Sequence, residues 1–235
     1  MLAIEGVGKC YKTGWRRSPV EVLRDIRLQV HPGEILGLCG PSGSGKTTLA
    51  RMIPDLVRPS TGKIRFRGED ITRLTGKQRV SYRRKVQIVF QNPLLSLDPK
   101  QSVFDAVAEP LKVHGLVESK SGLREKVGAL LSDCGLPEEI GGRLPREISG
   151  GQAQRVVLAR ALSVNPELII GDEMTSMLDV SVQTQILHLL QRLRKDRGLT
   201  LMLISHDRDL LRAVCNRVAM LEGGRIQEVW GLADR

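Results

Sequence analysis

The sequence Gly40-Pro-Ser-Gly-Ser-Gly-Lys-Thr47 combines three glycines with a closing lysine and threonine. The apolar run 34–39 before it predicts a buried strand. Residues 46–52 after it predict a helix that ends near Pro54, because proline cannot continue the helical hydrogen bonds. Glycines in such a loop let backbone N–H groups close around phosphate oxygens, and the helix directs its positive end at the same anion. The segment therefore predicts a phosphate-binding loop.

Two side chains of this loop carry the nucleotide chemistry. Lys46 would supply a positive charge to the β- and γ-phosphates, and the Thr47 hydroxyl can ligate Mg²⁺. ATP and Mg²⁺ are the cofactors that this pattern predicts. The nucleotide-binding residues predicted here are Gly40, Pro41, Ser42, Gly43, Ser44, Gly45, Lys46, Thr47 and Thr48.

Further strands and helices alternate along the chain. Short apolar runs predict strands at 86–90, 168–170 and 199–204, and residues 179–197 predict an amphipathic helix with Gly198 as its C-terminal cap. Alternating strands and helices imply a mostly parallel sheet with helices on both faces. The predicted fold class is thus an α/β P-loop NTPase core.

Other segments add to this core. Antiparallel strands are expected at both ends of the chain, and Gly223-Gly224 suits a hairpin turn between residues 218–221 and 226–229. Residues 94–155 have helical stretches and no convincing strand, so we expect an inserted helical subdomain there. The chain 1–235 is then one domain, with its core at 1–93 and 156–235.

Asp172 and Glu173 directly follow the apolar strand 168–170. Ligands of open parallel sheets gather at the carboxyl ends of the strands, so these acids should face the phosphate-binding loop. Asp172 would hold the Mg²⁺ shell, and Glu173 would polarise the attacking water as a general base.

The segment Ser149-Gly-Gly-Gln152 precedes a helical run and is compatible with a second anion site. Ser149 suits the N-cap, and the glycines leave the helical amides open to an anion. Taken alone, these residues favour an ordinary capped helix, because a second phosphate site in one small domain has no evident purpose.

The chain resembles the ABC ATPases in six motifs. Residues 40–48, Gln91, 149–152, 172–173, 176–179 and His206 follow the order and spacing of that family's Walker A, Q-loop, signature, Walker B, D-loop and H-loop motifs. The resemblance covers the chain from Leu2 to about Val229.

The resemblance implies a head-to-tail dimer, in which the signature helix of one subunit meets the γ-phosphate held by the other. It implies nucleotide contacts from Ser149, Gly150, Gly151, Gln152 and Asp179. Gln91 would sense Mg²⁺ and the catalytic water, and His206 would touch the γ-phosphate. Tyr11 resembles the aromatic residue that stacks on adenine, with Trp15 as a competitor.

A finer resemblance concerns residues 90–99 (Phe-Gln-Asn-Pro-Leu-Leu-Ser-Leu-Asp-Pro) and 109–115 (Glu-Pro-Leu-Lys-Val-His-Gly), which are similar to the second ATPase of peptide and nickel importers. It implies a second, non-identical ABC ATPase, two transmembrane permease subunits and an extracytoplasmic substrate-binding protein as partners. The cargo would be a peptide or a nickel-type metal or chelate. Gly171, Met174 and Met177 depart from the family pattern, which usually has a larger apolar residue, proline and alanine there.

Composition narrows the class of protein. Hydrophobic residues make up 41% and charged residues 26% of the 235 residues, as is usual for a soluble globular domain. No apolar run approaches the roughly 20 residues that span a bilayer, and residues 1–7 do not resemble a signal peptide. We therefore expect a cytoplasmic protein, and the resemblance implies that permease partners hold it peripherally at the inner face of the cell membrane.

The net charge of +10 permits nucleic acid or an anionic membrane as a partner. Aromatic residues are 3% of the chain, which leaves little for base stacking, and no nucleic-acid partner is expected. The clusters 83–85 and 192–197 should be solvated helix faces. Each cysteine should be reduced and buried as a small apolar side chain; the four are Cys10, Cys39, Cys134 and Cys215.

Two rival functions follow from the same sequence. A soluble ABC ATPase that acts on DNA or the ribosome is compatible with the basic charge, but the chain has no coiled-coil heptads and no charged interdomain linker. A P-loop kinase would not explain the motif at Ser149.

Overall fold

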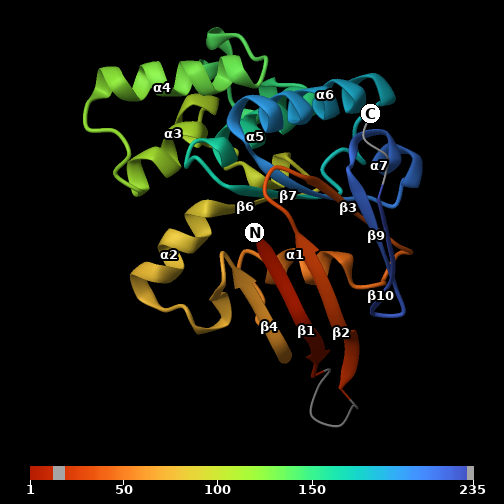
Figure 1. The fold of residues 1–235 in the computed structure, drawn as a ribbon. Coiled ribbons are helices and arrows are strands. Elements are labelled where there is room, and N and C mark those ends of the chain that lie inside the picture. The colour runs from red at the N-terminus through yellow and green to blue at the C-terminus, as the bar shows by residue number, and fades with distance from the viewer. Residues whose placement is uncertain (13–18, 232–235) are drawn as a thin grey trace.

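The computed structural model describes residues 1–12 and 19–231, which form two sheets and a group of helices (Figure 1). The larger sheet contains, in spatial order, β10 (Arg225–Gly231), β9 (Arg217–Glu222), β3 (Ile35–Cys39), β8 (Thr200–Ile204), β7 (Leu168–Asp172) and β6 (Val86–Val89). Its strands from β9 to β6 are parallel, and β10 pairs antiparallel with β9. The predicted mostly parallel core is confirmed.

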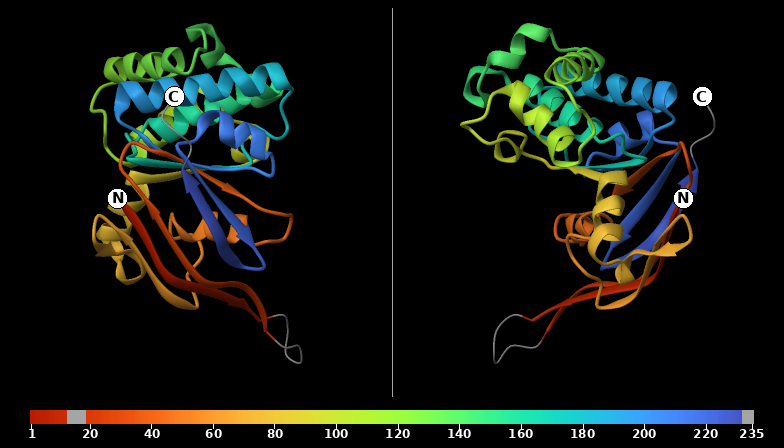
Figure 2. Two further views of the ribbon diagram at one scale, coloured as in Figure 1. Left: turned by 45° about the vertical axis from the view of Figure 1, so that its right-hand side comes forward. Right: turned by 90° about the vertical axis from the view of Figure 1, so that its left-hand side faces the viewer.

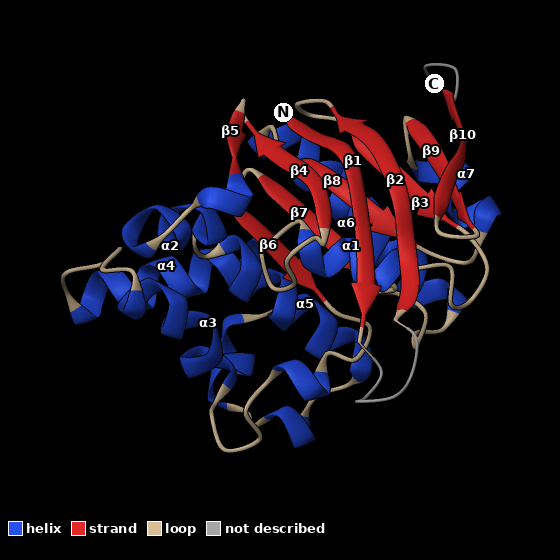
Figure 3. Cartoon of the chain, turned by 90° about the horizontal axis from the view of Figure 1, so that it is seen from below, coloured by secondary structure: helices blue, strands red, loops and turns tan. Residues whose placement is uncertain are grey.

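The smaller sheet is antiparallel throughout. It contains, in spatial order, β2 (Val20–Val30), β1 (Leu2–Tyr11), β4 (Thr61–Phe66) and β5 (Glu69–Asp70) (Figure 3). The predicted N-terminal antiparallel strands are therefore present. At the other end of the chain, Gly223 and Gly224 turn the hairpin from β9 to β10, both with left-handed backbones at φ 56° and 74°.

Seven α-helices are described: α1 (Lys46–Met52), α2 (Gly76–Lys85), α3 (Val103–Val113), α4 (Lys120–Asp133), α5 (Gly150–Leu162), α6 (Val180–Arg197) and α7 (Arg208–Val214). Four 3-10 turns accompany them: η1 (Ile71–Arg73), η2 (Leu94–Ser96), η3 (Glu138–Gly142) and η4 (Pro145–Glu147). Helices α3 to α6 form a layer on one side of the larger sheet, and the smaller sheet lies beyond its other side (Figure 2).

Alternating side chains of the central strands serve two separate cores. In β3, Ile35 and Cys39 belong to the cluster that includes α3 to α6, whereas Leu36 and Leu38 belong to the cluster that includes α1 and the smaller sheet. Both sets are fully buried. A strand that is apolar on both faces is what a parallel sheet covered by helices requires.

Local signals in the sequence fix several helix ends. Ser149 caps α5 in a capping box with Gln152, and Asp179 caps α6 by accepting from Val182 N. Gly198 ends α6 with φ 62°, as predicted. The division of the chain near residue 155 stays a prediction, and α5 runs through that residue without a break.

Three of the four cysteines are buried as predicted, and burial raises the pKa of Cys134 and of Cys215 to about 12. The prediction is wrong for Cys10, which is exposed because β1 leaves the core near its end.

The basic residues 192–197 on α6 were predicted to form a solvated helix face. One of them also makes a contact within the chain, since Arg194 Nε donates to Gly33 O at 2.6 Å. Among residues 1–12 and 19–231, no helix combines the length and the apolar character needed to cross a bilayer.

Candidate active site

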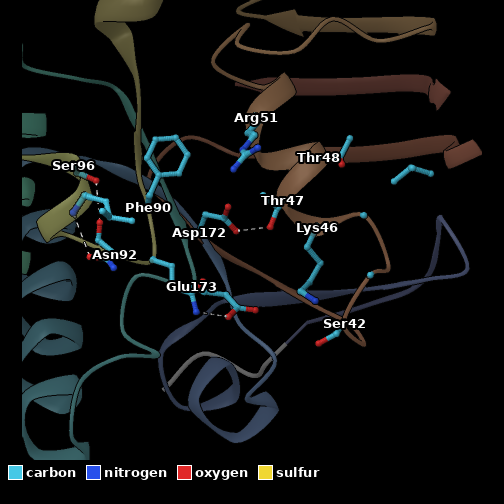
Figure 4. Close-up of a pocket in the computed structure, with 15 residues that line it drawn as sticks. Ser42, Lys46, Thr47, Thr48, Arg51, Phe90, Asn92, Ser96, Asp172 and Glu173 are labelled. Atoms are coloured by element: carbon cyan, nitrogen blue, oxygen red, sulfur yellow. Dashed lines mark hydrogen bonds between the residues drawn. The ribbon is translucent and has the colours of Figure 1, made fainter. Parts of the chain in front are cut away.

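A cavity of about 580 Å³ lies where the loop before α1 meets the ends of β6 and β7 (Figure 4). It is lined by Val22, Ser42, Gly43, Gly45, Lys46, Thr47, Thr48, Arg51, Phe90, Gln91, Asn92, Leu95, Ser96, Asp172 and Glu173. The cavity thus brings together the phosphate-binding loop, Gln91 and both acids that the sequence predicts. Arg51 and Phe90 were not predicted, and the Arg51 guanidinium lies 5.9 Å from the centre of the Phe90 ring.

Two glycines of the loop are required by both conformation and space. Gly40 and Gly45 have φ values of 155° and 105°. A Cβ at Gly40 would lie 2.0 Å from Leu221 O, and a Cβ at Gly45 would lie 2.6 Å from Leu23 Cδ2. The loop is therefore held against β9 and β2, with its free side toward the cavity.

Lys46 lies inside the loop and is 6% exposed. Its ammonium donates to Gly40 O at 2.8 Å and to Pro41 O at 3.0 Å. The Ser44 hydroxyl is buried and has no hydrogen-bond partner among the described residues. A buried hydroxyl without a partner is costly, so this loop fits a ligand that accepts hydrogen bonds, such as a phosphate.

Thr47 and Asp172 face each other across the cavity floor, with Thr47 Oγ1 donating to Asp172 Oδ1 at 3.3 Å (Figure 4). Burial raises the pKa of Asp172; the Thr47 hydrogen bond lowers it, and the charge of Glu173 raises it further. Hydroxyl and carboxylate oxygens are the ligands that Mg²⁺ prefers, and a cation between them would offset the cost of the buried charge. The donor set at this point fits Mg²⁺.

The Glu173 carboxylate lies close to two further predicted residues, His206 and Gln91. His206 Nδ1 lies 3.6 Å from Glu173 Oε1, and Gln91 Nε2 lies 3.5 Å from Glu173 Oε2. The backbone of Glu173 is left-handed, with φ 51°, a region that a residue with a Cβ rarely adopts. Such backbone strain clusters at active sites, and no pattern in the sequence predicts it.

The segment after Glu173 is held from the side of α6. Gln183 Nε2 donates to Thr175 O at 2.8 Å and to Leu178 O at 3.1 Å. The sequence analysis did not single out Gln183, because nothing distinguishes it there from the other polar residues of α6.

Other predicted residues lie apart from this cavity. Within the described parts of the chain, neither residues 149–152 nor Asp179 belong to the cavity lining. Ser149 and Gly150 are exposed at the start of α5. Tyr11 is likewise outside the lining as far as the structure describes it, with Lys9 Nζ 4.9 Å from its ring centre. Trp15 lies outside the described residues.

Two departures from the family pattern prove to be neighbours. A Cβ at Gly171 would lie 2.6 Å from Met174 Sδ and 3.0 Å from Met174 Cγ. The Met174 side chain is 4% exposed and so fills the space that glycine leaves in β7. The third departure, Met177, is 61% exposed.

Comparison with known proteins shows the family of this chain. The sequence profile of the family described as ABC transporter matches residues 23–176. The chain is 42% identical to the nickel import ATP-binding protein NikE of Pseudomonas putida, over 97% of this chain and 84% of that protein. It is 39% identical to the oligopeptide transport ATP-binding protein OppF of Streptococcus mutans, over 100% of this chain and 75% of that protein.

The fold agrees as well. The dimeric structure of a post-hydrolysis state of the ATP-binding cassette MJ0796, bound to ADP and Pi, superposes with a TM-score of 0.90 at 30% identity. The superposition covers 100% of both chains. On the match of the family profile and the fold, this chain belongs to the ABC transporter family, as an ATP-binding subunit that hydrolyses ATP.

Proposed function

We propose that this chain is the motor subunit of an importer, which couples ATP binding and hydrolysis to the uptake of a peptide or of a nickel-type metal or chelate. The observation that carries this proposal is the contact between Gln91 and Glu173 at the mouth of the nucleotide cavity. Gln91 also begins the segment that leads into the helical layer. One residue therefore contacts the proposed general base and is itself exposed at the surface. The two importer ATPases compared above support the class of cargo.

The residues of the cavity divide the chemistry. Lys46 and the loop amides hold the β- and γ-phosphates, while Glu173 accepts a proton from the water that attacks the γ-phosphorus. His206 stands beside the Glu173 carboxylate, where it can contact the transferred phosphoryl group. Catalysis here is mostly positioning and charge stabilisation.

Thr47 and Asp172 would hold Mg²⁺, with Gln91 as a further ligand. When bound, this ion neutralises charge on the phosphate oxygens. The 3.3 Å separation of the Thr47 and Asp172 oxygens supports the assignment.

A matched pair of variants tests the nucleotide chemistry. Lys46→Ala should weaken ATP binding, because it removes the charge inside the loop. Glu173→Gln should bind ATP as the unmodified chain does and lose turnover, because an amide is not a base at neutral pH. Equilibrium nucleotide binding and phosphate release are measured on both, and wild-type hydrolysis by Glu173→Gln would exclude the general-base role.

A groove beside the nucleotide cavity supports docking on a permease. It has a volume of about 530 Å³ and lies between the end of β6, η2, α3 and α5. Leu95 and Val113 line it and are 85% and 74% exposed. Exposed apolar side chains that line one groove together are typical of protein contact sites. Two permease subunits, served by an extracytoplasmic substrate-binding protein, would hold the chain at the cytoplasmic face of the cell membrane.

The exposed start of α5 supports a second ABC ATPase as partner, and the resemblance to importer ATPases supports one that is not identical to this chain. The amides near Ser149 and Gly150 are open to an anion and do not line this chain's own cavity, as far as the described residues go. In a head-to-tail pair they would meet the γ-phosphate that the partner holds, together with Asp179.

A further inference from the structure

Two sulfur atoms lie in contact immediately before the phosphate-binding loop. Cys39 is the last residue of β3 and pairs with Met220 of β9. The Cys39 thiol donates to Met220 Sδ at 3.4 Å. Cys39 is fully buried and Met220 is half-buried, so the methionine is the part of this pair that solvent reaches.

A second thiol lies on the same face of β3. A Cβ at Gly37 would lie 3.0 Å from Cys215 Sγ, and residues two apart in a strand, such as Gly37 and Cys39, share one face. Burial, together with the charge of Cys39, raises the pKa of Cys215 to about 12. Cys215 therefore stays a neutral thiol at neutral pH.

Three positive charges act on the Cys39 thiol. Burial raises the pKa of Cys39, whereas the charges of Arg208, Lys46 and Arg212 lower it. Arg208 Nη2 also lies 3.5 Å from Met220 Sδ. With Cys215 neutral, the cluster can supply one thiolate and one thioether to a ligand.

The chemistry of these donors selects a class of metal ion. Thiolate and thioether sulfurs favour soft ions such as Cu(I). One thiolate and one monovalent cation form a neutral unit, whereas a divalent ion would leave a positive charge in the interior, which is costly. A structural zinc ion takes four ligands, and no cluster of three or more histidine, cysteine, aspartate or glutamate residues suited to a metal occurs in the described parts of the chain.

We propose that Cys39 and Met220 form a binding site for Cu(I), and that its occupancy weakens ATP binding. On binding, the S–H bond of Cys39 breaks, its proton passes to solvent, and Sγ bonds to the metal. The ion stays Cu(I) throughout, so no oxidant or reductant takes part. The site goes beyond the proposed function and does not depend on cargo or permeases.

The effect on ATP follows from the neighbouring residues. Cys39 directly precedes Gly40, and Met220 directly precedes Leu221, whose carbonyl oxygen lies 2.0 Å from the place of a Cβ at Gly40. A metal held at about 2.3 Å from each sulfur separates the two sulfurs by up to about 4.6 Å, compared with 3.4 Å here. Widening this contact displaces the support of the phosphate-binding loop.

The first test measures Cu(I) binding to the purified chain, without oxygen, by competition with a chromogenic Cu(I) chelator. Cys10→Ser is the parent, because exposed Cys10 can bind metal by itself. The parent should bind one Cu(I) and show an ultraviolet thiolate-to-metal absorption band. Cys39→Ala should abolish the band, and Met220→Leu should weaken the affinity by about 10-fold or more. Cys134→Ala is the matched control at another buried thiol and should change neither.

The second test measures ATP affinity with and without one equivalent of Cu(I). The loaded parent should bind ATP about 5-fold or more weakly, and ATP should lower the Cu(I) affinity by the same factor, because coupling between two sites is reciprocal. Met220→Leu, at a Cu(I) concentration that fills only the parent, should keep its ATP affinity.

Equal Cu(I) affinity in the parent and in Met220→Leu would overturn the proposal, and this variant keeps the size of the side chain, so it serves even if Cys39→Ala does not fold. An ATP affinity that bound Cu(I) leaves unchanged would overturn it as well. Neither measurement involves hydrolysis or transport, so the importer proposal is tested separately.

Discussion

Replacing Gly171 by alanine should destabilise the chain, although glycine inside a strand is itself unfavourable. The new methyl group would lie 2.6 Å from Met174 Sδ, 3.0 Å from Met174 Cγ and 3.2 Å from Leu203 Cδ2. Overpacking of this kind costs about 1–3 kcal/mol, and the lower backbone entropy of alanine returns about 0.5–1 kcal/mol. The expected net loss is about 1–2 kcal/mol, or a fall in Tm of about 2–8 °C.

Met174→Ala alone should cost about 2–4 kcal/mol, because it leaves a cavity beside β7. In the double variant the alanine methyl of position 171 enters that cavity. The double variant should therefore be more stable than the sum of the single losses predicts, by about 1–2 kcal/mol.

Thermal unfolding of the four proteins measures this coupling. Gly142→Ala is the control, since a Cβ at Gly142 meets nothing within 4 Å and its φ is not left-handed. Strictly additive losses would refute the reasoning, because they would mean that Met174 does not occupy the space beside Gly171.

Three further predictions concern surfaces. Leu95→Glu should abolish recovery of the chain with membranes when its permeases are co-expressed, whereas Val80→Glu, at another exposed apolar side chain on α2, should not; membrane attachment without permeases would instead indicate lipid binding. Ser149→Arg should retain the ATP affinity of the purified chain and lose turnover in the assembled complex; a loss of affinity like that of Lys46→Ala would exclude the arrangement in trans. Iodoacetamide should alkylate Cys10 in the folded chain and spare the three buried thiols, which peptide mass mapping can check.

Short-range patterns predicted the core of the fold well. The helix 46–52 and the cap at Gly198 came directly from residues whose conformational preferences are strong. The strands 168–170 and 199–204 were located to within two residues, since continuous apolar runs bounded by loops leave few alternatives. Helix α2 carries a weaker signal, because Tyr82 is its one buried residue.

Features that depend on the packing of the folded chain could not be predicted from the sequence. The left-handed backbone of Glu173 follows from bonds to Ile204 and Ser176, and no propensity favours it at a glutamate. The exposure of Cys10 depends on where β1 leaves the sheet. Gly171 and Met174 looked like two unrelated departures until packing placed one against the other.

The close approach of Gly40 to Leu221 O has a consequence for the order of events during synthesis. The phosphate-binding loop leaves the ribosome before β9, the strand that it rests on, which follows some 180 residues later. At about 5–20 residues per second this interval lasts roughly 10–40 s. Throughout that time the nascent chain has a phosphate-binding sequence but no finished site, so ATP can stabilise the protein only after β9 has been synthesised.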